Sequence, residues 1–211
     1  MGAEAVVGIV ISIITVLVAI LALLQTNRQV VLSNKQRLFD RRIEKYLLLQ
    51  ELLALYCSGR CVLKKNSFAD VDTPFGCLTN CARLETVYAI IKRPDDNQLR
   101  ILFLKKCEEL EHAATEMQLI WDKKLGELPS LFVKQYVQLL KALFVKQNKF
   151  FMLEQDKTKR AMSLEEVQEE LKQSIESGGL ISAFDEIENT YHKIEKQQLV
   201  EKLAQSIKLV K

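Results

Sequence analysis

The strongest feature of the hydrophobic pattern is an uninterrupted apolar stretch near the start of the chain. Residues 5–24 read AVVGIVISIITVLVAILALL and contain no charged residue. A helix of this length rises about 30 Å, which matches the hydrocarbon thickness of a bilayer. The stretch therefore predicts one transmembrane helix, with residues 1–27 as the anchor. A cleavable signal peptide fits less well, because the preceding residues include Glu4 and no Lys or Arg.

Beyond the anchor, apolar residues recur at spacings of three and four, which is typical of amphipathic helices. One stripe continues the anchor into a long helix: Leu32, Phe39, Ile43, Tyr46, Leu49, Leu53 and Cys57. Another is formed by Leu99, Phe103, Cys107, Leu110, Ala114, Met117 and Trp121. No segment shows the strict alternation that predicts a strand. We therefore expect an all-α protein.

Caps and helix breakers set the expected boundaries within this helical part. Asp72-Thr73-Pro74 is typical of a helix start, and this helix should run to about Ile91. Pro94 should begin the next helix, Gly126 should end it, and Pro129 should begin another. Residues 28–158 are thus predicted to form an antiparallel helical bundle.

After residue 158 the chain becomes more acidic and its predicted helices become shorter. Two capping boxes introduce them, Ser163 with Glu166 and Ser182 with Asp185, and Gly178-Gly179 lies between. Residues 159–211 are therefore expected to form an acidic C-terminal helical appendage.

Charge predicts the orientation of the anchor. The net charge of +3 is too small to indicate nucleic-acid binding by itself. The first four residues contain no Lys or Arg, whereas Arg28, Lys35 and Arg37 follow the apolar stretch closely. By the positive-inside rule, the N-terminus should lie outside and the bundle in the cytoplasm, next to anionic membrane lipid.

Small and hydroxyl residues form a regular stripe along the anchor. Their spacings of 3 and 4 continue past the apolar stretch, and the positions are Ala5, Gly8, Ser12, Thr15, Ala19, Ala22, Thr26 and Gln29. Small residues let membrane helices approach closely, so the stripe predicts a homo-oligomer. It fits either tight helix packing or the lining of a narrow pore. The hydroxyl groups do not decide, because Ser and Thr can also bond their own backbone.

The sequence offers little for enzyme chemistry. It has two histidines and lacks a phosphate-binding glycine loop, a G-x-S-x-G elbow and an H-E-x-x-H motif, so we expect neither an enzyme nor a cofactor. A candidate site for an anionic ligand, such as a nucleotide or oligonucleotide, could form around the symmetry axis of the assembly from Arg93, Arg100, Lys105, Lys106, Lys123 and Lys124. The alternative is that these side chains are simply solvated, since Glu108 and Glu109 are close in sequence.

Four cysteines form a twin pattern, Cys57-x-x-x-Cys61 and Cys77-x-x-x-Cys81. In a helical hairpin centred near residue 69, Cys57 would lie opposite Cys81 and Cys61 opposite Cys77. This arrangement resembles the twin C-x-x-x-C hairpin of the small Tim chaperones, in which it implies two disulfides. A cytoplasmic location favours reduced thiols packed as small apolar side chains, and four thiolates could also bind zinc.

Two broader resemblances bear on function. Leu38-Phe39-Asp40-Arg41-Arg42 with Tyr46, ahead of a helical bundle, is similar to uncharacterised bacterial single-span proteins. The layout also resembles the membrane pore effectors of anti-phage systems of the Hailong type. That resemblance implies a bacterial inner-membrane effector whose spans form or gate a pore, while the bundle senses a ligand or protein partner. The alternative is a non-conducting, membrane-tethered scaffold that recruits a protein partner.

Overall fold

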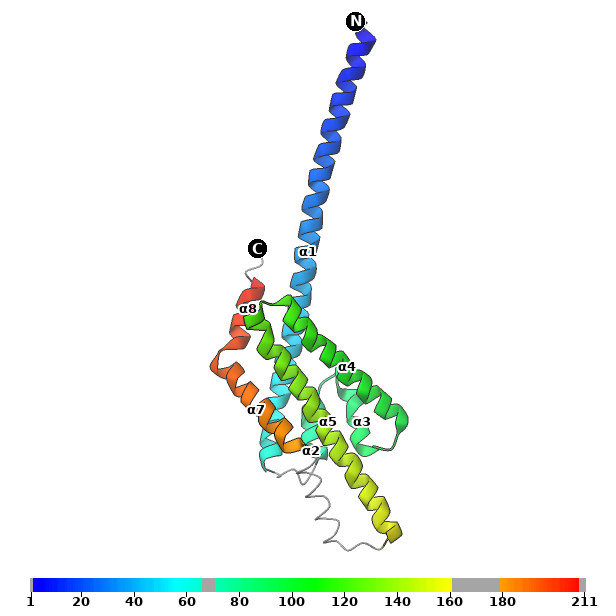
Figure 1. Ribbon diagram of the computed structural model, residues 1–211, viewed down its shortest axis with the longest axis vertical. Coiled ribbons are helices and arrows are strands. Elements are labelled where there is room, and N and C mark those ends of the chain that lie inside the picture. Colours follow the sequence, from blue (N-terminus) through cyan, green and yellow to red (C-terminus); the bar gives the residue numbers. More distant parts are fainter. Residues whose placement is uncertain (1, 66–70, 161–178, 209–211) are drawn as a thin grey trace.

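The computed structural model describes residues 2–65, 71–160 and 179–208, and these residues contain seven helices and no strand. The helices are α1 Ala3–Lys65, α2 Asp72–Thr79, α3 Glu85–Lys92, α4 Asn97–Ile120, α5 Lys123–Arg160, α7 Leu180–Lys196 and α8 Leu199–Lys208. The predicted all-α class is confirmed. The lower part of α1 and α5 descend through the bundle, while α4, α7 and α8 ascend (Figure 1).

The first helix is much longer than any other and projects far beyond the bundle (Figure 1). It is long and apolar enough to cross a membrane, and its most apolar stretch is not buried. The prediction that the apolar stretch continues into the bundle as one helix is confirmed. Neither glycine nor proline interrupts α1 between Ile9 and Ser58, which leaves the helix without a breaker over that length.

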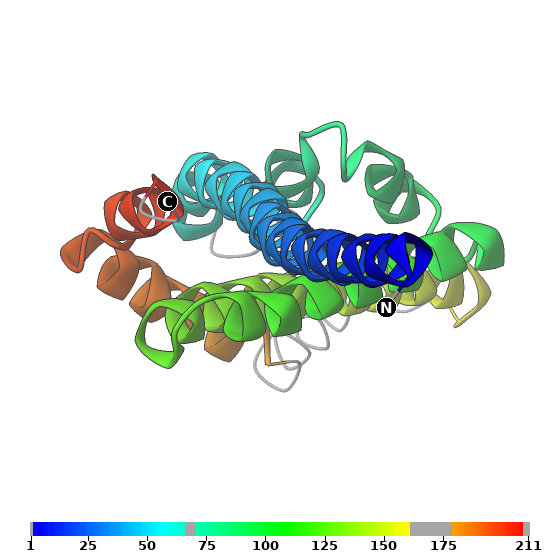
Figure 2. The same ribbon diagram turned by 90° about the horizontal axis from the view of Figure 1, so that it is seen from above.

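One hydrophobic core joins all the helices of the bundle. Viewed along α1, α4 and α5 lie on one side of it, and the pairs α2–α3 and α7–α8 flank it (Figure 2). The core contains Tyr56 from α1, Phe75 from α2, Phe103 from α4 and Tyr136 from α5, all of them almost fully buried. Helices α7 and α8 belong to this core through Ile187, Leu203 and their neighbours. Residues 159–211 were predicted to form a separate appendage, whereas α7 and α8 pack into the bundle.

The helix predicted from residue 72 to about Ile91 is in fact two helices, α2 and α3, joined by a turn at residues 80–84. The Thr79 hydroxyl donates to the Phe75 carbonyl at 2.8 Å, and the turn is closed by a bond from the Leu84 amide to the Cys81 carbonyl at 2.9 Å. The bend lets Leu84 reach the core together with α2 and α3. No glycine or proline marks this turn, so the sequence pattern missed it.

Two other predicted boundaries were displaced. Helix α4 begins at Asn97 rather than Pro94, because Asp96 caps it by accepting bonds from the amides of Gln98 and Leu99. Helix α5 begins at Lys123 and includes both Gly126 and Pro129, which were predicted to separate two elements. The chain turns at Trp121, whose extended backbone ends α4.

Close packing requires a glycine at position 126, because a Cβ on Gly126 would lie 2.6 Å from the Met117 carbonyl oxygen. The Ser182 capping box was also wrong: α7 starts at Leu180 after Gly179, and the Ser182 hydroxyl bonds Glu186 instead. The Ser163 box lies outside the described residues.

Candidate functional site

The predicted association face lies on the exposed part of α1. The stripe residues Gly8, Ser12, Thr15, Ala19, Ala22, Thr26 and Gln29 are all exposed in the single chain, and the side chain of Ala5 is outside the described part. The Ser12 and Thr26 hydroxyls each donate to the carbonyl four residues earlier, at 2.9 Å. A Cβ at Gly8 would meet nothing within 4 Å.

The stripe residues would form one continuous contact line only if α1 were supercoiled with other helices. A heptad spacing drifts about 20° per repeat on an undistorted α-helix, so the positions from Ala5 to Gln29 turn by about 70° around α1. A left-handed supercoil would align them along one seam. On a single undistorted α1 the stripe therefore turns slowly around the helix.

Residues of the predicted anion site do not gather in one place. Arg93 and Arg100 lie near the start of α4, whereas Lys123 and Lys124 follow its end, and the helix between them is about 35 Å long. Arg93 pairs with Asp96 at 3.6 Å, and Lys106 pairs with Glu109 at 2.5 Å. The remaining positions, Arg100, Lys105, Lys123 and Lys124, are exposed. A single chain therefore does not form a basic pocket from these six positions.

The four cysteines of the twin pattern are not arranged as predicted. All of them are free thiols, as is the buried Cys107. Helix α2 crosses α1 at Gly59, where a Cβ would lie 3.5 Å from the Cys77 Cβ. Because Gly59 points about 160° away from Cys57 and Cys61 around the helix, the two pairs cannot face each other.

Neither of the other two predictions, reduced thiols packed in the core and a zinc site, fits all four cysteines. The core-packing reading fails for Cys57 and Cys61, which are exposed, whereas Cys77 and Cys81 are half-buried. In the part of the chain that the structure describes, no three His, Cys, Asp or Glu side chains are placed to hold a metal ion.

A charged network that sequence analysis did not predict fastens α7 to α1. The Tyr56 hydroxyl donates to Glu188 at 2.7 Å, and the Arg60 guanidinium lies 3.5 Å from the same carboxylate. His192 adds a contact of 3.2 Å to Glu188, whose side chain is only 12% exposed. Burial, followed by the bond to Glu188, raises the pKa of Tyr56, so this hydroxyl keeps its proton and remains a donor. The only sequence signal was the four-residue spacing of Glu188 and His192.

Beside this network lies a cavity of about 380 Å³ between α1, α7 and α8. Its walls are mainly apolar and include Leu53, Ala54, Ile194 and Val200. The lining is completed by Tyr191, Gln198, the Cys57 thiol and two carboxylates, Glu195 and Glu201. This volume falls within the range of small-molecule sites in proteins.

A second, wider groove of about 780 Å³ is bounded by α2, the turn after it and α3. One of its two carboxylates, Asp72, accepts a bond from the Tyr88 hydroxyl at 2.9 Å and pairs with Lys92 at 2.5 Å. The other carboxylate, Glu85, and the Asn80 amide also line the groove.

No protein family, curated protein or solved structure was found to match this chain. The fold and the surfaces described above define an all-helical protein with one helix that could span a membrane.

Proposed function

We propose that the chain is a homo-oligomeric membrane effector whose first helix spans the bacterial inner membrane. The N-terminus lies outside, the bundle lies in the cytoplasm, and several copies of α1 form or gate a pore under the control of the bundle. Ligand or partner sensing by the bundle, and a role in anti-phage defence, are parts of the same proposal.

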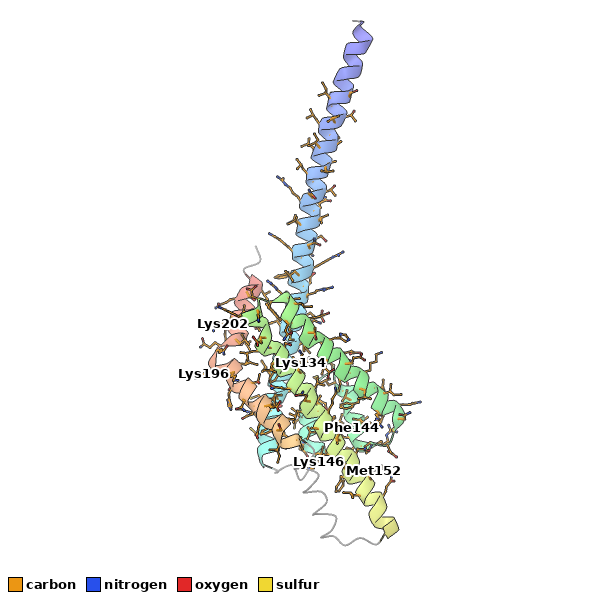
Figure 3. All side chains as sticks on the ribbon, in the orientation of Figure 1. Lys134, Phe144, Lys146, Met152, Lys196 and Lys202 are labelled. Atoms are coloured by element: carbon orange, nitrogen blue, oxygen red, sulfur yellow. The ribbon has the colours of Figure 1, made fainter. Side chains whose placement is uncertain are left out.

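The observation that carries this proposal is the surface of upper α1. Every side chain from Ser12 to Arg37 is exposed, including the apolar residues Ile14, Leu17 and Leu21. A long exposed apolar surface is unfavourable in water. Figure 3 shows these side chains standing clear of the rest of the chain. An apolar helix exposed on all sides requires lipid, other helices or both. The small-residue stripe supplies the face for contact with other helices.

Assembly can be tested at Gly8 and Ala19. Because a Cβ at Gly8 meets nothing within one chain, Gly8→Leu should leave the folded monomer unchanged while blocking close approach of another helix. We expect Gly8→Leu and Ala19→Leu to shift the purified protein to smaller species, measured by light scattering in detergent. Leu17→Phe adds bulk on the opposite face of α1 and is the control. If all three variants keep the wild-type mass, the stripe is not the association face.

Conduction can be tested with cysteines introduced at Ser12 and Thr15. If the stripe lines an open pore, both positions should react with a small water-soluble thiol reagent, and the modification should change ion flux. Cysteines at Ile13 and Leu17 should stay unreactive because they face lipid or neighbouring helices. An absence of conductance in cells whose response to the protein is switched on would contradict the pore.

The geometry of the stripe hydroxyls supports the alternative of a non-conducting scaffold. Ser12 and Thr26 bond their own backbone, so neither needs pore water or a partner helix to satisfy its hydroxyl. A scaffold predicts an oligomer or monomer without conductance and without reactive stripe cysteines. The two experiments above therefore separate assembly from conduction.

A further inference from the structure

We propose that the cavity between α1, α7 and α8 binds a small organic cation with an apolar body. The ligand class follows from the lining, because the walls are mostly apolar, with Tyr191 beside the aliphatic side chains, and two carboxylates border the space. No Lys or Arg is among the described residues that line it. An apolar pocket with a few placed polar groups is the usual form of a small-molecule site.

The two carboxylates are brought together by a short turn between α7 and α8. Glu195 lies in the last turn of α7 and Glu201 in the first turn of α8, and only two residues separate the helices. Gln198 in this turn has a φ of 49°, which non-glycine residues adopt at a cost. Since Gln198 also lines the cavity, this left-handed residue holds both carboxylates beside the same space.

Charge should decide which ligands enter. Glu195 already contacts the His192 Nδ1 atom at 3.3 Å, so a cationic head gains its ion pair mainly from Glu201, while its apolar body covers Leu53, Ile194 and Val200. An anion of the same size would meet two carboxylates and should be rejected.

The position of the cavity suggests how such a ligand would act, and this consequence rests on the proposed function. Leu53, Ala54 and Cys57 belong to α1, the same helix whose upper part is the candidate span. A ligand between α1 and the α7–α8 pair would therefore contact the membrane helix directly. The ligand would be the signal that the cytoplasmic bundle senses.

Cys57 provides a reporter and Cys61 a matched control. Both thiols are exposed, but only Cys57 lines the cavity. Trypsin cleaves after Arg60, so alkylation of the two cysteines by N-ethylmaleimide can be measured on separate peptides. The full-length protein in a neutral maltoside detergent is incubated with butyltrimethylammonium, or with butanesulfonate at the same ionic strength.

We expect the cation to slow alkylation of Cys57 about fivefold at roughly four times its dissociation constant, by simple mass action. Cys61 should be unaffected, and butanesulfonate should protect neither thiol. Glu201→Gln should weaken protection about fivefold, as loss of a partly exposed ion pair predicts. Glu108→Gln, an equal charge change on the exposed face of α4, should leave protection unchanged.

Equal protection by butanesulfonate, equal protection of Cys61, or no protection by the cation at about 10 mM would overturn the proposal. Binding is measured here without any membrane current. Protection without conductance would therefore contradict only the pore, and conductance without protection would contradict only the ligand site.

Discussion

The upper and lower parts of α1 belong to one continuous helix but meet different surroundings. In the lower part, from Lys45 to Leu63, one face is buried against the bundle, and the opposite face carries exposed or half-buried residues such as Gln50 and Ser58. In the upper part, from Ser12 to Leu24, apolar side chains cover the whole circumference and all are exposed. An apolar face opposite a polar face therefore marks only the lower part, where one side of the helix faces water and the other faces the bundle.

Between these parts lies a stalk, residues 25–37, that is more polar but equally exposed. It is about 20 Å long and projects beyond the bundle (Figure 1). Isolated helices of this length are marginal in water, so the stalk is expected to gain support from other copies.

Shortening one leucine to alanine in each part of α1 should give the largest difference in stability. Leu52 is fully buried, and Leu52→Ala should lower the free energy of unfolding of the bundle by about 2–5 kcal/mol. Leu21 is 64% exposed in the single chain, so Leu21→Ala should leave unfolding of the bundle unchanged. Urea unfolding in detergent, followed by Trp121 fluorescence, measures both. A comparable loss from Leu21→Ala would mean that the upper part contributes to the stability of the bundle.

Removing one hydroxyl group from the bundle and one from upper α1 should give the next largest difference in stability. Tyr136 is fully buried and donates to the Leu78 carbonyl, so Tyr136→Phe leaves a buried acceptor unpaired and should cost about 1–3 kcal/mol. The Ser12 hydroxyl only returns to its own backbone, and Ser12→Ala should change stability by less than about 0.5 kcal/mol. Thermal unfolding of both variants beside the wild-type protein provides the measurement. Equal losses would show that Ser12 bonds another chain.

Sequence patterns predicted the elements whose signal is local and strong. The run from Ala5 to Leu24 contains no charged residue, and the stripe through Phe103 and Met117 has the spacing of one buried helix face. These patterns therefore predicted the long first helix and α4. The break after Thr79 was missed, because it depends on tertiary burial of Leu84 and has no glycine or proline to mark it.

The sites were harder to predict than the helices. Glu188 meets Tyr56 across 132 positions of sequence, and no periodicity connects such distant residues. The cavity beside them exists only because the turn at Gln198 places α8 against α1. The twin cysteine pattern failed for the opposite reason: its symmetry in sequence assumed a hairpin, and the packing of Gly59 against α2 points the two pairs to different sides.

The smallest expected effect concerns the junction of the two parts of α1, where the helix enters the bundle. The Lys45 ammonium lies 2.8 Å from Glu116 of α4, and the Arg42 guanidinium donates to the Ile120 carbonyl at 2.8 Å. The hydrogen bond from Lys45 lowers the pKa of Glu116 below its usual value. A carboxyl group whose pKa is lowered by folding stabilises the folded protein above its unfolded pKa, and this contribution is lost as the pH falls through the folded pKa.

Glu116→Gln should therefore destabilise the bundle near neutral pH by less than about 1 kcal/mol, since the Glu116 side chain is 45% exposed and solvent screens the pair. The difference from the wild-type protein should shrink towards zero at about pH 3, where the unfolded carboxyl is protonated and the folded one is losing its charge. Glu108→Gln, on an exposed position of α4, should show no such dependence. Urea unfolding at the two pH values measures the difference, and a gap that stays constant or widens in acid would mean that the charge of Glu116 does not hold α1 to α4.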